Sequence, residues 1–242
     1  MNILAISKMS IYDQMEIMCI NEAININQNL AVKIIPINLD NHHFTKIINK
    51  VNTVVFQSQN AVKYSLNLHN DLMREKKNFF CLGKYSVNII NEMIGVSAEC
   101  PASEYTSENV ADLILKNHER INGCLIIKGR GGRSVIKERL ERDGVHVSTI
   151  DVYHREPREN FIKIDHLDAK SKNYVIVSSE MAIKNFLDNL GSDYAAYDII
   201  FVVPNQRLLT NLSYKNIRSL IIKNSSSAYE YLAKIKECAN EF

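Results

Sequence analysis

The sequence carries no excess of charge of either sign. Lysine and arginine total 29 residues against 27 aspartate and glutamate residues, so the formal net charge at pH 7 is +2. No basic run of more than a few residues interrupts this balance. Proteins that bind nucleic acid present clustered positive charge, so the composition argues against a nucleic-acid partner and requires any anion site to be local.

Long apolar runs are also missing. No apolar segment reaches the roughly 18 residues that suffice to cross a membrane as a helix. The first residues, MNILAISKM, lack the basic start and the long apolar run of a secretory signal. The remaining composition, 46% hydrophobic and 23% charged, is that of an ordinary globular protein. We therefore expect a cytoplasmic protein that binds no membrane.

Disulfide patterns and metal-ligand spacings are absent too. The cysteines are odd in number, widely spaced and set among apolar residues: Cys19, Cys81, Cys100, Cys124 and Cys238. This pattern favours reduced thiols in the core over disulfides. The seven histidines show no HxxxH spacing and the cysteines no CxxC spacing, so we expect no metal site.

What the sequence does contain is a strand–turn–helix–strand stretch between Cys124 and Pro157. The apolar run CLII is followed by the turn KGRGGR, an amphipathic helix, a stop at Asp143-Gly144, and a second apolar strand that reaches Tyr153. This pattern predicts a βαβ unit in a parallel sheet with a right-handed crossover. Ligands bind beyond the carboxyl ends of such strands, so the turn and Tyr153 are predicted to lie on the ligand side.

The turn itself suits an anionic ligand. Its residues are Lys128, Gly129, Arg130, Gly131, Gly132 and Arg133. The glycines allow close approach of the backbone, the helix start offers unpaired N–H groups, and the arginines add fixed positive charge. A tight turn with solvated charge would have the same sequence. A nucleotide fingerprint is not present, because the third glycine of GxGxxG and a Gly-Lys-Ser/Thr sequence are both missing.

A repeat at an offset of about 120 residues divides the chain into two similar α/β domains. The strand at Val54 to Ser58 resembles that at Val175 to Ser179, and a later strand is expected at Val96 to Cys100. The segment from Asn2 through a second strand at Val32 to Ile37 resembles the Cys124 unit. We expect flavodoxin-like domains with five parallel strands each, and a ligand between them. The expected boundaries are 1–38 with 168–242 for the first domain, 45–153 for the second, inserted domain, and 39–44 with 154–167 for the linker.

Four stretches together resemble the uroporphyrinogen-III synthase family. They are VFQSQNAV from Val55 to Val62, LGKYS from Leu82 to Ser86, KGRGGR from Lys128 to Arg133, and Val152-Tyr153. They occur in the family's order and at its spacing, and the resemblance covers nearly the whole chain. The family's fold has two α/β domains joined by a two-stranded linker, with the first domain discontinuous, in agreement with the division above.

The resemblance implies a cofactor-free lyase of tetrapyrrole biosynthesis, the route to heme and siroheme. Its reaction is the cyclisation of the linear tetrapyrrole hydroxymethylbilane to uroporphyrinogen III, with loss of water and inversion of ring D. Spontaneous closure proceeds without inversion, so the enzyme's main task is to position the chain. The implied partners are this substrate and, in transient contact, hydroxymethylbilane synthase; we expect a monomer.

The same resemblance assigns roles to individual residues. Tyr153 matches the family's tyrosine near the leaving hydroxyl, as general acid or orienting donor, although a strand-end tyrosine packed on the linker is the structural alternative. Ser58 and Ser86 match hydroxyl donors to substrate carboxylates, with Ser86 standing where threonine is more usual; Gln57 also replaces a common threonine. The other residues expected to bind substrate are Gly83, Lys84, Lys128, Gly129, Arg130, Gly131 and Arg133 and, from the first domain, Ser178, Ser179, Asn205 and Arg207.

Two other classes of function fit parts of the pattern. A two-domain binding module would close on an anionic small molecule without chemistry and would give Tyr153 no special role. A phosphosugar or nucleotide enzyme would use Gly129 to Arg133 as a phosphate cradle. Neither class accounts for the ordered set of four stretches.

Overall fold

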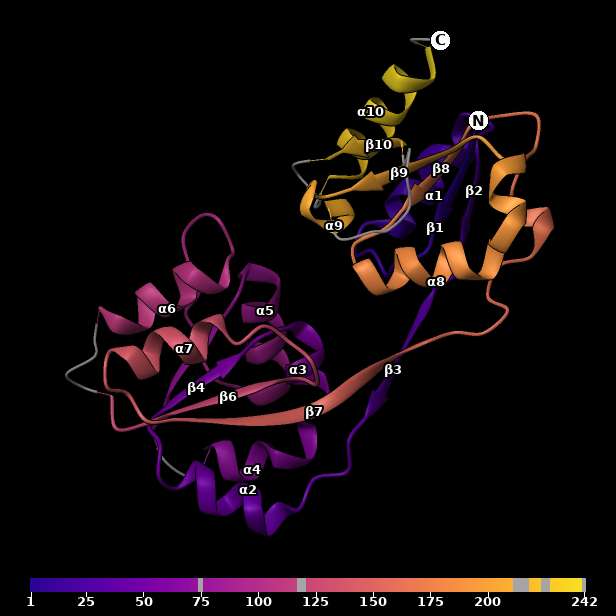
Figure 1. The fold of residues 1–242 in the computed structure, drawn as a ribbon. Helices are drawn as coiled ribbons and strands as arrows, with labels where there is room; N and C mark the ends of the chain where they lie inside the picture. Colours follow the sequence, from indigo (N-terminus) through magenta and orange to yellow (C-terminus); the bar gives the residue numbers. More distant parts are fainter. Residues whose placement is uncertain (74–75, 117–120, 211–217, 223–226, 241–242) are drawn as a thin grey trace. The chain divides into compact units, whose positions relative to one another are not determined.

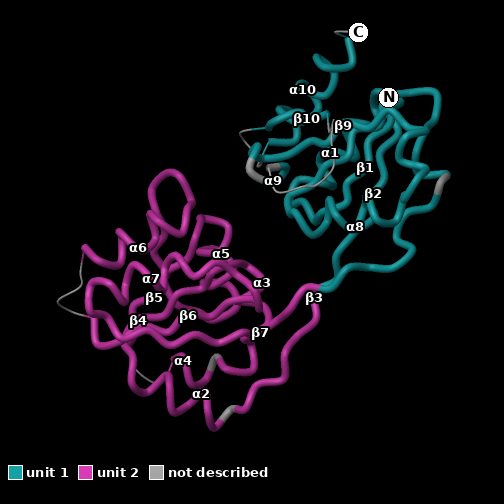
Figure 2. The backbone as a smooth tube through the Cα atoms, in the orientation of Figure 1, with its two compact units in different colours: residues 1–33, 156–242 teal, residues 34–155 magenta. Residues whose placement is uncertain are grey.

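The chain divides into two compact units (Figure 2). The computed structural model describes residues 1–73, 76–116, 121–210, 218–222 and 227–240, without the side chains of residues 41, 69, 164, 207 and 210. Unit 1 consists of residues 1–33 and 156–242, and unit 2 of residues 34–155. Unit 2 is therefore inserted into unit 1, and the expected α/β class with two mostly parallel sheets is confirmed.

Unit 1 is built on a five-stranded sheet of order β10-β9-β8-β1-β2, and the strand pairs are parallel (Figure 1). Alternate strand residues face opposite sides, so Ile3 packs under α1 and α10 while Leu4 packs under α8. The elements are β1 Asn2–Ala5, α1 Tyr12–Asn21, β2 Asn25–Gln28, the 3-10 turn η3 Ile164–His166, β8 Asn173–Ile176, α8 Glu180–Leu190, η4 Gly191–Ala196, β9 Ile199–Val203, α9 Arg207–Thr210, β10 Arg218–Ile221 and α10 Ala228–Asn240.

The second strand of unit 1 is not the one that the sequence predicted. The polar segment Asn25–Gln28 pairs with β1, whereas Val32–Pro36 forms β3 in the sheet of unit 2. An edge strand tolerates polar residues because one side of its ladder remains open. Asn25 also donates from Nδ2 to Oδ1 of Asn2 at 2.9 Å, which fixes the edge by a side-chain contact.

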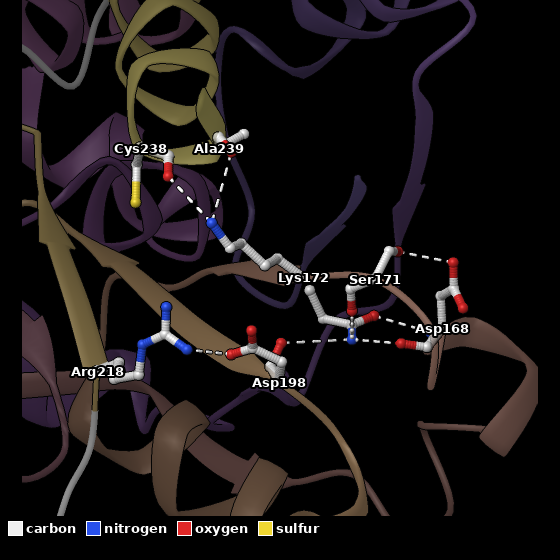
Figure 3. Close-up of polar contacts among 8 residues, drawn as sticks. Asp168, Ser171, Lys172, Asp198, Arg218, Cys238 and Ala239 are labelled. Atoms are coloured by element: carbon white, nitrogen blue, oxygen red, sulfur yellow. Dashed lines mark hydrogen bonds and ion pairs between the residues drawn. The ribbon is translucent and has the colours of Figure 1, made fainter. Parts of the chain in front are cut away.

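Polar contacts hold the amino ends of the unit 1 strands together. Buried Asn173 donates to the carbonyls of Asp168 (2.8 Å) and Ser171 (3.0 Å) and accepts from Asn2 Nδ2 at 2.8 Å. Figure 3 shows Lys172 reaching the last carbonyls of α10, and the ion pair of Arg218 with Asp198 between β10 and β9. These contacts lie at the edge opposite the carboxyl ends of the strands, so they stabilise the sheet and leave its other edge open.

Unit 2 has a five-stranded sheet of order β3-β7-β6-β4-β5. One face packs against α2, α3, α4 and α5, and the other against α6 and α7 (Figure 1). The elements are β3 Val32–Pro36, α2 Asn41–Ile48, β4 Thr53–Phe56, α3 Gln59–Lys63, η1 Leu66–Leu68, α4 His69–Met73, β5 Asn78–Cys81, α5 Lys84–Ile94, α6 Ser107–Leu115, β6 Cys124–Gly129, α7 Val135–Arg142 and β7 Val147–Pro157.

Two features of unit 2 differ from expectation. The segment at Val96 to Cys100 makes only an isolated bridge, between Glu99 and Phe80, so the fifth strand is β3 instead. The segment 39–44, expected to be linker, contains the start of α2, which Asp40 caps by accepting from the N–H of His42 at 3.0 Å. The two strands that connect the units are β3 and β7, which run antiparallel, with Ile37 donating to Val152 at one end and Arg158 to Ala31 at the other.

Candidate functional site

A small polar cavity of about 130 Å³ lies at the carboxyl edge of the unit 2 sheet. Strands β4, β5 and β6 end there, and β7 passes this edge at Tyr153. Parallel sheets bind ligands at this edge. The residues that line it are Gln57, Ser58, Leu82, Ser107, Gly129, Gly132, Arg133, Tyr153 and Arg155. Five of them, Gln57, Ser58, Gly129, Arg133 and Tyr153, are residues that the sequence singled out as site candidates.

A β-bulge directs Tyr153 into this cavity. Lys128 pairs with Asp151, but the next residue, Gly129, pairs with Tyr153, so β7 carries one extra residue. Val152 and Tyr153 consequently both face the α2–α5 core, and the Tyr153 side chain is only 2% exposed. The N–H of Arg130 donates to the Tyr153 carbonyl at 2.8 Å, which fixes the backbone there. Bulges of this kind commonly re-aim side chains at functional sites.

The Tyr153 hydroxyl has two polar neighbours. It lies 3.0 Å from Oγ of Ser58, and Nη2 of Arg155 donates to it at 3.0 Å. The Arg155 guanidinium also stands over the ring, 5.2 Å from its centroid, while the Tyr64 ring packs at 5.8 Å. Ser58 additionally caps α3 by accepting from the N–H of Ala61 at 3.1 Å. The phenol ring is therefore buried, and its hydroxyl is hydrogen-bonded to both Ser58 and Arg155.

The glycine-rich turn is held by its own side chains. Lys128 is only 16% exposed and donates to the Gly132 carbonyl at 3.3 Å, and its ammonium lies 3.6 Å from Asp151. Gly131, with φ of +75°, takes the left-handed conformation that closes the turn. Arg133 contacts Ser107 (3.3 Å) and Glu108 (3.5 Å), whereas Arg130 is exposed. Arg133 thus ties the turn to α6, and Arg130 is left facing solvent.

The start of α5 lies beside the cavity, and Leu82, immediately before it, lines the wall. Gly83 is the N-cap, Lys84 is exposed, and Ser86 is buried on the helix. Burial raises the pKa of the neighbouring Cys81 to about 11, and this thiol donates to the Gly83 carbonyl. Cys81 therefore stays protonated at neutral pH and is not a nucleophile.

The candidates from the first domain lie at the carboxyl ends of strands in unit 1. Ser179 caps α8, the exposed Ser178 donates from its N–H to Ser7 Oγ at 3.1 Å, and Asn205 is exposed after β9. Arg207 begins α9, and its side chain is outside the described part of the chain. The structure therefore brings Ser178, Ser179 and Asn205 to one sheet edge, in a different unit from Tyr153.

Two polar residues of the cavity were missed from the sequence, Arg155 and Ser107. Side chains two apart on a strand share a face, so extending the strand alternation beyond Tyr153 would have pointed to Arg155. Ser107 is the first residue of α6, directly after its cap Thr106, and only the fold brings it to the cavity.

Neither a metal-ligand cluster nor a membrane-spanning helix is present in the described ranges of the chain. No group of three or more histidine, cysteine, aspartate or glutamate residues there is arranged to hold a metal ion. In that part of the chain, no helix combines the length and apolar character needed to cross a bilayer.

Comparison with known proteins identifies the relatives of this chain. Its fold resembles a mutant uroporphyrinogen III synthase from the extremely thermophilic bacterium Thermus thermophilus, with a TM-score of 0.59 and 8% identity over 98% of this chain and 100% of that one. It also resembles uroporphyrinogen-III synthetase from Helicobacter pylori, with a TM-score of 0.63 and 14% identity over 98% and 99% of the two chains. No curated protein matches the sequence significantly.

The family assignment rests on the sequence itself. Residues 32–205 match the family model described as uroporphyrinogen-III synthase HemD. That span contains all of unit 2, including the Tyr153 cavity, and continues through β8 and β9 of unit 1. The chain therefore belongs to the uroporphyrinogen-III synthase family of lyases.

Proposed function

We propose that Tyr153 is the residue through which this chain performs the reaction of its family. That reaction closes hydroxymethylbilane to uroporphyrinogen III, with loss of water and inversion of ring D. The observation that carries the proposal is the linked pair of hydroxyls, Ser58 and Tyr153, 3.0 Å apart in the cavity at the carboxyl edge of unit 2. Such a pair can donate a proton to a leaving hydroxyl.

The hydroxyls of Ser58 and Tyr153 have one hydrogen between them that is available to a group in the cavity. The Ser58 oxygen already accepts from the Ala61 N–H, and the Tyr153 oxygen accepts from Arg155, whose guanidinium can only donate. The two hydroxyls share one hydrogen bond, which uses one of their two hydrogens. The other hydrogen is left for a group in the cavity. We assign it to the departing hydroxyl of the substrate, with Tyr153 as the donor or the orienting partner.

The size of the cavity limits what it can hold. Pockets that enclose a drug-sized ligand measure roughly 300–1,000 Å³, whereas this one measures about 130 Å³. We therefore assign only the hydroxymethyl end of the substrate to it. The carboxylates of the tetrapyrrole are assigned to donors outside: Arg130, Lys84 and the backbone N–H groups of the turn.

The remaining candidates complete the proposed set of donors. On unit 2 these are Gln57, Gly83, Ser86, Lys128, Gly129, Gly131 and Arg133, which lie in or beside the turn and the strand ends. We propose that Ser178, Ser179, Asn205 and Arg207 of unit 1 bind further carboxylates of the same substrate. We also propose a cytoplasmic monomer that receives its substrate by transient contact with hydroxymethylbilane synthase, since free substrate would close without inversion.

The isomer of the product tests the proposed function. Hydroxymethylbilane is generated freshly, divided between samples with and without this protein, and the uroporphyrin isomers are separated after oxidation. We expect mainly isomer III with the protein and isomer I without it. If isomer I forms in both samples and tetrapyrrole is bound to the protein, the protein is a binding module that does not catalyse the closure.

A further inference from the structure

We propose that Arg155 is a positioning residue for Tyr153, which rests on the function proposed for Tyr153 above. Arg155 follows Tyr153 by two residues on β7, so the two side chains share a face of the strand. Its Nη2 donates to the phenol oxygen at 3.0 Å while its guanidinium stands 5.2 Å from the ring centroid. Two different contacts therefore join the same pair of side chains.

The hydrogen bond from Arg155 determines where the phenol hydrogen can point. Because a guanidinium has no acceptor, it must occupy a lone pair of the Tyr153 oxygen. The phenol hydrogen is then directed to Ser58 or into the cavity. Without Arg155 the hydroxyl could rotate toward other acceptors, and its proton would face the substrate for a smaller share of the time.

The positive charge of Arg155 also suits the proton transfer. When the leaving hydroxyl takes the phenol proton, water departs and an azafulvenium–phenolate pair remains. At the final closure, the unsubstituted carbon of ring D forms the new bond and loses its proton, which restores the phenol. A cation placed beforehand beside the oxygen stabilises the charge that develops there. Within the described residues, none of the ion pairs involves Arg155.

A double-mutant cycle distinguishes this role from direct substrate binding. Arg155→Met keeps an unbranched apolar side chain and removes the donor and the charge; because Arg155 is exposed, folding should be unaffected. We expect kcat for hydroxymethylbilane to fall roughly tenfold, with KM changed less than about twofold. In a Tyr153→Phe background the same substitution should change kcat by less than about twofold.

Several outcomes would overturn the proposal. An equal loss of kcat in both backgrounds would show that Arg155 acts independently of Tyr153, and a rise in KM at unchanged kcat would show that it binds a substrate carboxylate. A normal rate for Arg155→Met together with a slow rate for Tyr153→Phe would rule out the positioning role of Arg155 and leave the role of Tyr153 intact. A normal rate for Tyr153→Phe would rule out the proposed role of Tyr153. It would also rule out the role of Arg155, which acts through Tyr153.

Discussion

Gly129 and Tyr153 lie so close together that only glycine fits between the turn and the ring. A methyl group on Gly129 would lie 2.4 Å from Cζ and 2.8 Å from the hydroxyl oxygen of Tyr153. Because the ring is buried and its hydroxyl is hydrogen-bonded on two sides, it cannot move aside without losing contacts. The absence of a side chain at Gly129 thus makes room for the phenol.

Gly129→Ala should therefore lower both stability and activity. We expect a loss of about 1–3 kcal/mol in the free energy of unfolding, as for other overpacked cores, and a loss of turnover because the phenol is displaced. Gly144→Ala is the matched control. An alanine held at the Gly144 φ of +81° should lower stability by about 1–2 kcal/mol, but no atom lies within 4 Å of the new methyl group. Urea denaturation and initial rates give both quantities. Full activity of Gly129→Ala would show that the ring position is not critical.

Ser58→Ala should separate a helix cap from a catalytic contact. Loss of the α3 cap should cost about 1 kcal/mol of unfolding free energy, and loss of the contact with Tyr153 should lower kcat roughly tenfold. Ser227→Ala removes a similar acceptor, 3.1 Å from the N–H of Glu230, at the start of α10. We expect this control to lose stability and keep its rate. Equal rates for the two variants would contradict a role for Ser58 beyond capping.

Arg130→Ala should weaken binding of the anionic tetrapyrrole with little effect on folding, because Arg130 is exposed. One charge-assisted contact is worth roughly 1–2 kcal/mol, so the Kd of the product should rise roughly five- to thirtyfold at low salt. Arg142→Ala, an exposed residue of α7, is the charge-matched control. Unaltered product affinity of the Arg130 variant at low salt would assign the anion contacts to backbone N–H groups.

Alkaline pH should destabilise the protein through its buried thiols. Burial raises the pKa of Cys124 from its ordinary value of 9.0 to about 12. Below pH 9 the thiol is protonated in both the folded and the unfolded state. Above pH 9 the thiol ionises in the unfolded chain but not in the folded one, so the free energy of unfolding falls by up to about 1.4 kcal/mol per pH unit for this group. Urea denaturation under reducing conditions between pH 8 and 11 should show a shallower decline for Cys124→Ala. Parallel declines would contradict this contribution.

The βαβ unit between Cys124 and Pro157 was predictable because its sequence signals are local. Apolar runs at Cys124 and Val147 and the helix stop at Asp143 specify strands and a helix by themselves. The strand Asn25–Gln28 was not predictable, because its pairing with β1 relies on backbone and side-chain hydrogen bonds that leave no apolar alternation in the sequence.

The site was predictable in part for the same reason. Ser58 follows β4, Gly129 ends β6 and Tyr153 pairs with Gly129 on β7, so their meeting follows from parallel pairing. Arg155 was missed because β7 continues through the segment expected to be linker. The bulge opposite Gly129 could not be foreseen either, since no residue pattern marks an extra residue in the ladder.

The rate and product isomers of Tyr153→Phe test the central claim most directly. Phenylalanine keeps the buried ring and removes only the hydroxyl, so the free energy of unfolding should fall by no more than about 1 kcal/mol. We expect kcat to fall roughly a hundredfold, the low end for general acid assistance, because water leaves readily from an electron-rich pyrrole. The enzyme-formed product should remain isomer III, with spontaneous isomer I increasing as the rate falls. Turnover at the wild-type rate would show that Tyr153 is a packing residue and contradict the account.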